Sequence, residues 1–160
     1  MNTKTKKLST VSMVLCGMFA ALVAIGAFIQ IPVPYMDYFT LQFFFVLLAG
    51  LILGADKGAI SVGCYVLLGL VGVPIFAAGG GIGYIFRPSF GYLVGFIVSA
   101  YVTGKVCEKL KASYKNYLLA CLAGFVVTYA IGIVYKFIIL NFYAHTPATL
   151  GVIFLSCFPL

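Results

Sequence analysis

The chain has 160 residues and a composition that excludes a soluble globular domain. Hydrophobic residues make up 64% of it, charged residues only 8%, and the mean hydropathy is +1.18. A soluble domain of this size cannot cover so much apolar surface, so we predict an integral membrane protein. The net charge of +7 suits the inner side of a membrane protein, which makes nucleic-acid binding unnecessary as an explanation.

Five apolar runs are each long enough to approach the span of a bilayer. About 20 apolar residues cross a hydrocarbon core of ~30 Å as a helix. A sixth apolar run, at residues 150–160, is too short to cross, so we expect a sixth helix that is truncated in this chain. We predict one all-α transmembrane domain over residues 1–160, with complete spans near residues 11–31, 39–55, 58–78, 88–104 and 117–141.

The lysines predict the orientation of these spans. Cytoplasmic segments of membrane proteins carry an excess of Lys and Arg. We therefore expect a multi-pass protein of the bacterial cell membrane with its N-terminus in the cytoplasm. Eight of the ten cations fall in the segments on that side, namely Lys4, Lys6, Lys7, Lys57, Lys105, Lys109, Lys111 and Lys115.

The cysteines and the histidine give no sign of a metal site. The five cysteines lie in or beside apolar runs without a Cys-x-x-Cys spacing, and His145 is the one histidine of the chain. Free cysteines usually behave as small buried hydrophobic residues. We expect no metal and no cofactor.

Rows of small residues at a spacing of four predict the faces on which helices pack. Two rows, in the fourth and fifth spans, are expected inside the bundle. The row in the first span suits either a helix of the same chain or a separate subunit. The three rows are Gly91, Gly95, Ser99 and Thr103; Gly124, Thr128 and Gly132; and Gly17, Ala20, Ala21, Ala24 and Ala27.

Arg87, the single arginine, is the strongest candidate for a binding residue. A guanidinium near hydrocarbon is costly and is typical of an anion site. Pro88 suits a first helical position, which would put the positive end of a helix dipole beside Arg87. Lys136 continues the row of Gly132 and is either a second ligand-facing cation or a lysine that reaches for the interface. The alternative for Arg87 is a structural ion pair with Asp37, the one acid expected on the outer side.

A glycine run precedes this arginine. It lacks both the third glycine of a dinucleotide fingerprint and the pattern of a P-loop, so nucleotide binding is rejected. Glycines let bare backbone approach a ligand closely, although a tight turn is the alternative. The run and the aromatic residues expected around it are Gly79, Gly80, Gly81 and Gly83 with Tyr84, Phe86, Phe90 and Tyr92.

The first outer loop, residues 31–42, is expected to act as a lid. Pro32 and Pro34 bar a helix and stiffen its backbone. Gln42 follows the loop and offers a donor and an acceptor, as an amide or ureido group of a ligand requires. Hydrogen bonding between helices is an equally good role for Gln42.

Several of these segments together resemble the BioY family, the biotin-binding S components of energy-coupling factor (ECF) transporters. Each segment alone is weak, and the set is specific. Met36-Asp37-Tyr38 and Ser89-Phe90 depart from the usual family pattern. The segments are Ile31-Pro-Val-Pro, Phe39-Thr-Leu-Gln42, residues 47–54, residues 67–76, the glycine run, and residues 87–96.

The resemblance implies a six-helix S-component bundle that captures biotin from outside and works with a transmembrane coupling subunit and two cytoplasmic ATPases. In that family, an alanine pair on the first helix contacts the coupling subunit, and Ala20 and Ala24 match it. The family usually carries an Asp and a Lys in the sixth helix, which this chain does not reach. The expected substrate-binding residues are Arg87, Gln42, Gly79, Gly80, Gly81, Tyr84, Ser89, Tyr92, Phe39 and Lys136.

Two other functions are weighed against this one. An S component for another vitamin would share most of these features. A membrane enzyme acting on a lipid or a small carboxylate would need a reactive pair of side chains. The acids are Asp37, Asp56 and Glu108, with no paired carboxylate or histidine expected near Arg87, so we expect no catalysis.

Overall fold

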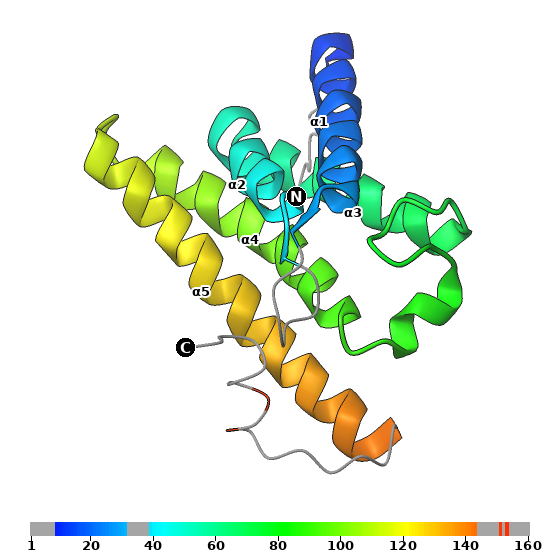
Figure 1. Cartoon of the computed structure of the whole chain (residues 1–160). Coiled ribbons are helices and arrows are strands. Elements are labelled where there is room, and N and C mark those ends of the chain that lie inside the picture. Colours follow the sequence, from blue (N-terminus) through cyan, green and yellow to red (C-terminus); the bar gives the residue numbers. More distant parts are fainter. Residues whose placement is uncertain (1–8, 32–38, 144–150, 152, 154–160) are drawn as a thin grey trace, which may run out of the picture.

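The structure, a computed structural model, describes residues 9–31, 39–143, 151 and 153. Five α-helices form a bundle, and short elements connect them at one end (Figure 1). The elements are α1 (Thr10–Phe28), β1 (Gln30–Ile31), β2 (Phe39–Thr40), α2 (Gln42–Leu53), α3 (Ala55–Val71), the 3₁₀ helix η1 (Ile82–Phe86), α4 (Phe90–Lys109), α5 (Tyr114–Ile138) and the π-helical turn η2 (Ile139–Tyr143).

Three helices in the described part are long and apolar enough to cross a membrane: α1, α4 and the continuous stretch Tyr114–Tyr143. The prediction of five helices is confirmed for these residues. The second and third helices are shorter than the predicted spans 39–55 and 58–78. The second is helical only over Gln42–Leu53, 12 residues, because Phe39–Thr40 pair as a strand. The third begins at Ala55 and stops at Val71, because Gly72 turns the backbone to a left-handed φ of 120°.

The fourth and fifth helices extend past their predicted limits, and part of the predicted sixth run and lid lies outside the described residues. The fourth and fifth helices extend further toward their connection than predicted, with α4 running to Lys109 and α5 starting at Tyr114. The partial sixth run, residues 150–160, lies almost wholly outside the described residues, as does the proline-rich part of the expected lid. The lid's flanks form a two-stranded antiparallel ribbon that the sequence did not predict, with Gln30 opposite Thr40 and Ile31 opposite Phe39.

Helix α4 lies at the centre of the bundle. It packs along α5 on one side and against α2 and α3 on the other, while α1 packs on α2 and α3 (Figure 1). The interface of α4 and α5 is close because small residues face each other. Ser99 Oγ donates to the carbonyl of Gly124 at 3.0 Å, and Thr103 Oγ1 donates to that of Ala120 at 3.3 Å. The predicted packing rows of the fourth and fifth spans are therefore confirmed as contacts within the chain.

The small-residue row of α1 is partly buried in the bundle and partly exposed. Ala20 is buried in the core at 7% exposure, and Ala24 is half-buried against it. Gly17 and Ala21, one step around the helix, are exposed. Contact of Ala20 and Ala24 with a separate subunit stays a prediction, and in this fold Ala20 also serves the interior of the bundle.

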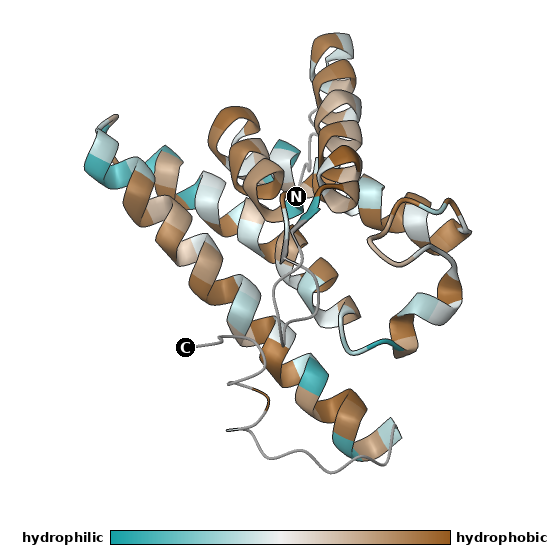
Figure 2. Ribbon diagram, viewed as in Figure 1, coloured by the Kyte–Doolittle hydropathy of each residue, from teal (hydrophilic) through white to brown (hydrophobic). Residues whose placement is uncertain are grey.

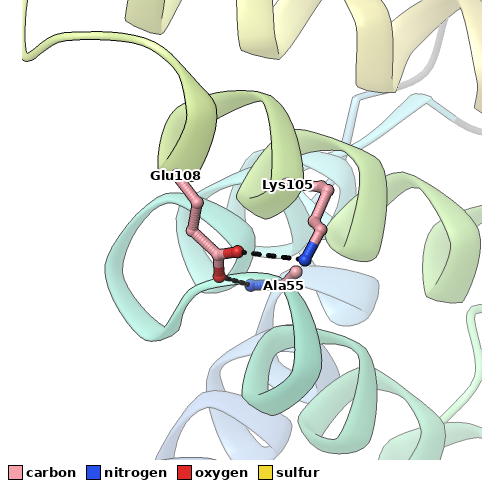
Figure 3. A network of polar contacts seen from close by, with 3 residues as sticks. All are labelled: Ala55, Lys105 and Glu108. Atoms are coloured by element: carbon pink, nitrogen blue, oxygen red, sulfur yellow. Dashed lines mark hydrogen bonds and ion pairs between the residues drawn. The ribbon is translucent and has the colours of Figure 1, made fainter.

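One end of the bundle carries most of the described lysines. The turn between α2 and α3, with Lys57 just after it, lies against the C-terminal part of α4. Glu108 joins the two, because its carboxylate accepts from the N–H of Ala55 and lies 3.5 Å from Lys105 Nζ (Figure 3). Hydrophilic residues also gather at the connection of α4 and α5, whereas the helices between the ends are mostly hydrophobic (Figure 2). The glycine run and Arg87 lie at the opposite end.

Candidate ligand-binding site

The candidate site is built on residues 72–89, which join α3 to α4 and which we call the connecting segment. Its start is fixed by the C-terminal cap of α3. Gly72 adopts a left-handed φ of 120°, and Val73 N–H donates to the carbonyl of Leu68 at 3.2 Å. Pro74 follows and cannot continue a helix. The chain therefore leaves α3 in a defined direction.

The glycine run forms a hydrogen-bonded turn. Phe76 and Gly79 exchange two backbone hydrogen bonds, of 2.9 and 3.2 Å, and Gly81 N–H donates to the carbonyl of Gly69 at 2.7 Å. Gly79 and Gly81 have left-handed φ angles of 110° and 103°, which favour glycine. Gly80 is also close-packed, since a Cβ there would overlap the carbonyl oxygen of Val73. The turn role of these glycines is thus a finding, and their contact with a ligand stays a prediction.

Phe76 anchors the connecting segment to the core. Its side chain is 1% exposed and lies between two tyrosine rings, with centroids 5.5 Å from Tyr65 and 4.6 Å from Tyr84. Gly69 of α3 makes room for this ring, because a Cβ at that position would overlap it. The ring of Phe76 therefore packs against the buried Tyr84 of η1 and holds it in place.

Three side chains from the rest of the protein donate hydrogen bonds to the carbonyls of this segment. Sequence reasoning missed all three. They are Tyr65 of α3, whose hydroxyl lies 3.0 Å from the oxygen of Ile75; Gln30 of β1, whose Nε2 lies 2.8 Å from the oxygen of Ala77; and Tyr135 of α5, whose hydroxyl bonds to the oxygen of Ile85.

Arg87 directly follows η1 and has an extended backbone, with its N–H bonded to the carbonyl of Tyr84 at 3.0 Å. Its side chain is exposed, and its guanidinium carbon lies 5.4 Å from the centre of the Tyr84 ring, a cation–π contact. Within residues 9–31 and 39–143, no acidic side chain forms an ion pair with it. Asp37, the expected alternative partner, lies outside the described residues. Arg87 is therefore held by an aromatic face and presents its charge outward.

The start of α4 differs from the prediction. The helix begins at Phe90, not at Pro88, because residues 87–90 close a turn in which Phe90 N–H donates to the carbonyl of Arg87 at 3.0 Å. Ser89 is the N-cap residue, but its side chain makes no capping hydrogen bond. The amino end of α4 still follows Arg87 closely, although one turn of chain separates them.

Gln42 is the first residue of α2 and is buried, at 3% exposure. Among the described residues, its Nε2 makes no hydrogen bond of standard geometry. Gly26 of α1 approaches closely, since a Cβ there would lie 2.8 Å from the Cα of Gln42. A buried donor without a hydrogen bond is costly, and contact of this amide nitrogen with a ligand stays a prediction. The Gln42 side chain also lies beside the hydroxyl of Tyr65 on α3, so the alternative of a hydrogen bond between helices stays open.

Tyr92 and Lys136 lie where α4 meets α5. The ring of Tyr92 covers Gly132 and stands edge-on to Tyr129, with centroids 5.9 Å apart. Lys136 is 8% exposed, one turn beyond Gly132, so it lies on the buried side of α5, and its contact with a ligand stays a prediction. The neighbouring Tyr135 bonds to the connecting segment, which brings this turn of α5 beside the stretch that leads to Arg87.

The structure thus brings most of the predicted residues to one end of the bundle without enclosing them in a single described pocket. A groove of ≈ 340 Å³ lies along α5 and shares only Tyr135 with the elements above; Ala130, Ile131, Val134 and Ile138 complete its lining. Phe39 lies in β2, and its side chain is outside the described set. Among the described residues, no three His, Cys, Asp or Glu side chains gather as a metal site would require.

Tyr65, Gln30 and Tyr135 were missed because each acts through one polar atom at the end of an apolar or half-buried side chain. In a sequence, a tyrosine in an apolar helix predicts a packing role, and a glutamine beside a loop predicts a side chain exposed to solvent. The one available signal was that a buried Tyr hydroxyl usually finds a hydrogen-bond partner. That rule indicates that a partner exists and does not say which carbonyl it is.

Comparison with known proteins identifies the family. The BioY family matches residues 1–159. A probable biotin transporter BioY of Lysinibacillus sphaericus is 42% identical over 154 residues, which are 96% of this chain and 78% of that protein. The biotin transporter BioY of Thermotoga maritima is 45% identical over 130 residues, 81% of this chain and 73% of that protein.

A solved structure supports the fold. The S-component for biotin from an ECF-type ABC transporter superposes with a TM-score of 0.79 at 24% identity, over 98% of this chain and 82% of that one. At this identity the likeness concerns the fold. The match over nearly the whole sequence confirms the resemblance found in the separate segments: the chain belongs to the BioY family.

Proposed function

We propose that this chain is the substrate-capturing membrane subunit of a biotin uptake transporter. Its relatives at 42% and 45% identity are named biotin transporters, and its fold is that of an S-component for biotin. Subunits of this kind bind and hand over a solute and carry out no covalent chemistry. The described residues fit that role, since they gather hydrogen-bonding and aromatic groups at one end of the bundle.

This proposal rests on the surroundings of Arg87. A cation follows a rigid, hydrogen-bonded turn, rests on the ring of Tyr84, and has no acidic partner among the described residues. Biotin is an acid with an uncharged bicyclic end. Its carboxylate would form a charge-assisted hydrogen bond with the guanidinium, which is stronger than a neutral one. Lys136 would contribute a second positive charge from α5.

The uncharged end of the ligand needs different partners. Gln42 Nε2 is a buried donor that makes no standard hydrogen bond to the described residues, which suits a ureido oxygen. The glycine run offers backbone groups without side chains in the way. Around these two elements we place the remaining predicted contacts, which are Gly79, Gly80, Gly81, Tyr84, Ser89, Tyr92 and Phe39.

The proposed function also implies an orientation in the membrane and a set of partner subunits. We infer a six-helix S-component bundle with the N-terminus in the cytoplasm and the site facing outward. The partners would be an ECF transmembrane coupling subunit, contacted through α1 at Ala20 and Ala24, and two cytoplasmic ATPases. The lysine-rich end formed by α3, α4 and α5 supports this orientation, because such ends face the cytoplasm.

A panel of vitamins tests the proposal. Purified protein in detergent is heated with biotin or with other vitamins, and the melting temperature is measured. A ligand at 100 times its dissociation constant stabilises the folded protein by about 2.7 kcal/mol, so biotin should raise the melting temperature by several degrees. A rise with another vitamin and none with biotin would reassign the substrate. No rise with any vitamin would remove the capture function for this chain.

A further inference from the structure

The connecting segment cannot hold a fixed conformation through its own hydrogen bonds alone. Connections of this length without regular structure are uncommon in compact domains, and they are usually functional or mobile. Here the only regular element is η1, which spans five residues. Backbone carbonyls that leave water also need partners, and a segment outside a helix or sheet cannot supply all of them itself.

The missing partners come from three different elements. Tyr65 from α3 binds the carbonyl of Ile75, Gln30 from β1 binds that of Ala77, and Tyr135 from α5 binds that of Ile85. These elements are far apart in the sequence. A shift of the connecting segment toward any one of them would lengthen a bond to another, so the three bonds fix its position in more than one direction.

The three bonds lie on both sides of the glycine run, and the last of them lies just before Arg87. Ile75 and Ala77 precede the glycine run, and Ile85 stands two residues before Arg87. The first two bonds lie on either side of Phe76, which forms an isolated β-bridge with Gly79, and the third holds the last turn of η1. The glycine backbone thus lies between fixed points, and Arg87 lies two residues beyond the last of them.

The remainder of the bundle does not depend on these bonds. The α4–α5 interface has its own hydrogen bonds, from Ser99 and Thr103, and α1 is joined to α3 by Ser61, whose hydroxyl lies 2.7 Å from the carbonyl oxygen of Cys16. Loss of a bond to the connecting segment should therefore loosen the segment before it loosens the fold.

We propose that Gln30, Tyr65 and Tyr135 are positioning residues of the binding site: they touch no ligand, and they hold the connecting segment so that the glycine run and Arg87 are in place before biotin arrives. The proposal rests on the function proposed above. Preorganisation of this kind lowers the ordering cost of binding and slows release.

Three variants that keep side-chain shape and remove the donor test this: Tyr65→Phe, Tyr135→Phe and Gln30→Met. A neutral hydrogen bond contributes about 0.5–1.5 kcal/mol, which corresponds to a change of about two- to tenfold. We expect each variant to raise the dissociation rate of labelled biotin by that factor. The matched control is Thr103→Val, which removes a bond of the same kind, from Thr103 to Ala120, at the lysine-rich half of the bundle. It should lower the ligand-free melting temperature at least as much and leave the dissociation rate unchanged.

Hydrogen exchange of peptides covering residues 72–87 provides a readout without ligand. The amides of Phe76, Gly81 and Arg87 are bonded within the connecting segment or to the end of α3, and they should exchange faster in the three variants than in wild type or Thr103→Val. Unchanged exchange would overturn the proposal, whether or not wild type retains biotin. Faster exchange with an unchanged dissociation rate would overturn it too, while leaving biotin capture intact. If wild type retains no biotin, the proposed function fails, and faster exchange alone still supports the positioning role.

Discussion

The carboxylate of Glu108 on α4 accepts a hydrogen bond of 3.0 Å from the backbone N–H of Ala55, the first residue of α3 (Figure 3). A residue from one helix thus caps the amino end of another. The usual cap position is occupied by Gly54, which has a left-handed φ of 82° and no side chain to donate or accept. The negative charge also lies at the positive end of the α3 dipole.

Replacement of Glu108 by Ala should destabilise this end of the bundle. The loss of a helix cap and of a favourable dipole contact predicts a decrease of about 0.5–1 kcal/mol in the free energy of unfolding. Thermal unfolding in detergent would measure it. Lys105→Ala is the control, because the pair of Lys105 with Glu108 is half-exposed and such pairs contribute little. An equal effect of both variants would mean that the ion pair, not the cap, is what stabilises.

Replacement of Arg87 by Ala should weaken biotin capture by about 1.5–3 kcal/mol, the range for a hydrogen bond to a charged group. Equilibrium retention of labelled biotin would measure the change. Arg87→Lys retains the charge and loses the forked geometry, so it should bind between wild type and Arg87→Ala. Undiminished retention in Arg87→Ala would remove the carboxylate contact from this residue.

The glycine run offers a matched pair of substitutions. Gly81 has a φ of 103°, so Gly81→Ala forces a side chain into a left-handed backbone and should cost about 1–2 kcal/mol. A Cβ on Gly83 meets nothing within 4 Å, and its φ is not in that region, so Gly83→Ala should be nearly neutral. Melting temperatures of the two variants would compare them. Equal tolerance at both positions would show that the turn is not needed in this form.

A second glycine pair tests the close packing of the helices. A Cβ on Gly104 would lie 2.6 Å from the Cα of Ala55, so Gly104→Ala must push α4 away from the turn between α2 and α3. Overpacking of this kind costs about 1–3 kcal/mol. Gly17→Ala meets open space on α1 and should slightly stabilise the helix. Unfolding measurements that rank the two in the opposite order would contradict the packing.

Gln42→Met should separate stability from binding. The substitution removes a buried donor that makes no standard hydrogen bond to the described residues, so the ligand-free protein should be as stable as wild type or more so. Biotin should then stabilise the variant less, because the ureido group loses its partner. Melting temperatures with and without biotin would show both effects. A less stable ligand-free variant with undiminished biotin stabilisation would place Gln42 in a structural role.

Class, helix number and helix packing could be predicted from the sequence because they follow from composition and from spacing. The rows containing Gly95 and Gly124 needed only the period of a helix. The ends of the helices were harder. Hydropathy continues smoothly past Val71, while the φ of Gly72 ends the helix there. The early residues of the second span are apolar as well, yet Phe39 pairs in a ribbon that depends on Ile31 across the loop.

The sequence indicates which residues are candidates for the site, but not the contacts that arrange them. Arg87 stood out as the single arginine, and the glycine run stood out by composition. The contacts that organise them depend on which carbonyl each donor reaches after folding. The bond from Tyr135 to Ile85 joins residues 50 positions apart, and nothing in either residue type identifies the other.

The short length of α2 decides how deep its amino end lies. Its 12 residues rise only ~18 Å from the lysine-rich end, against a hydrocarbon core of ~30 Å. Gln42 therefore lies closer to the lysine-rich end than the first residue of a full-length span would, whereas Arg87 is exposed. An acid with an uncharged ring would descend ring first and keep its charge at the mouth, so the protein could sense the ring's hydrogen bonds without ever burying the ligand's charge.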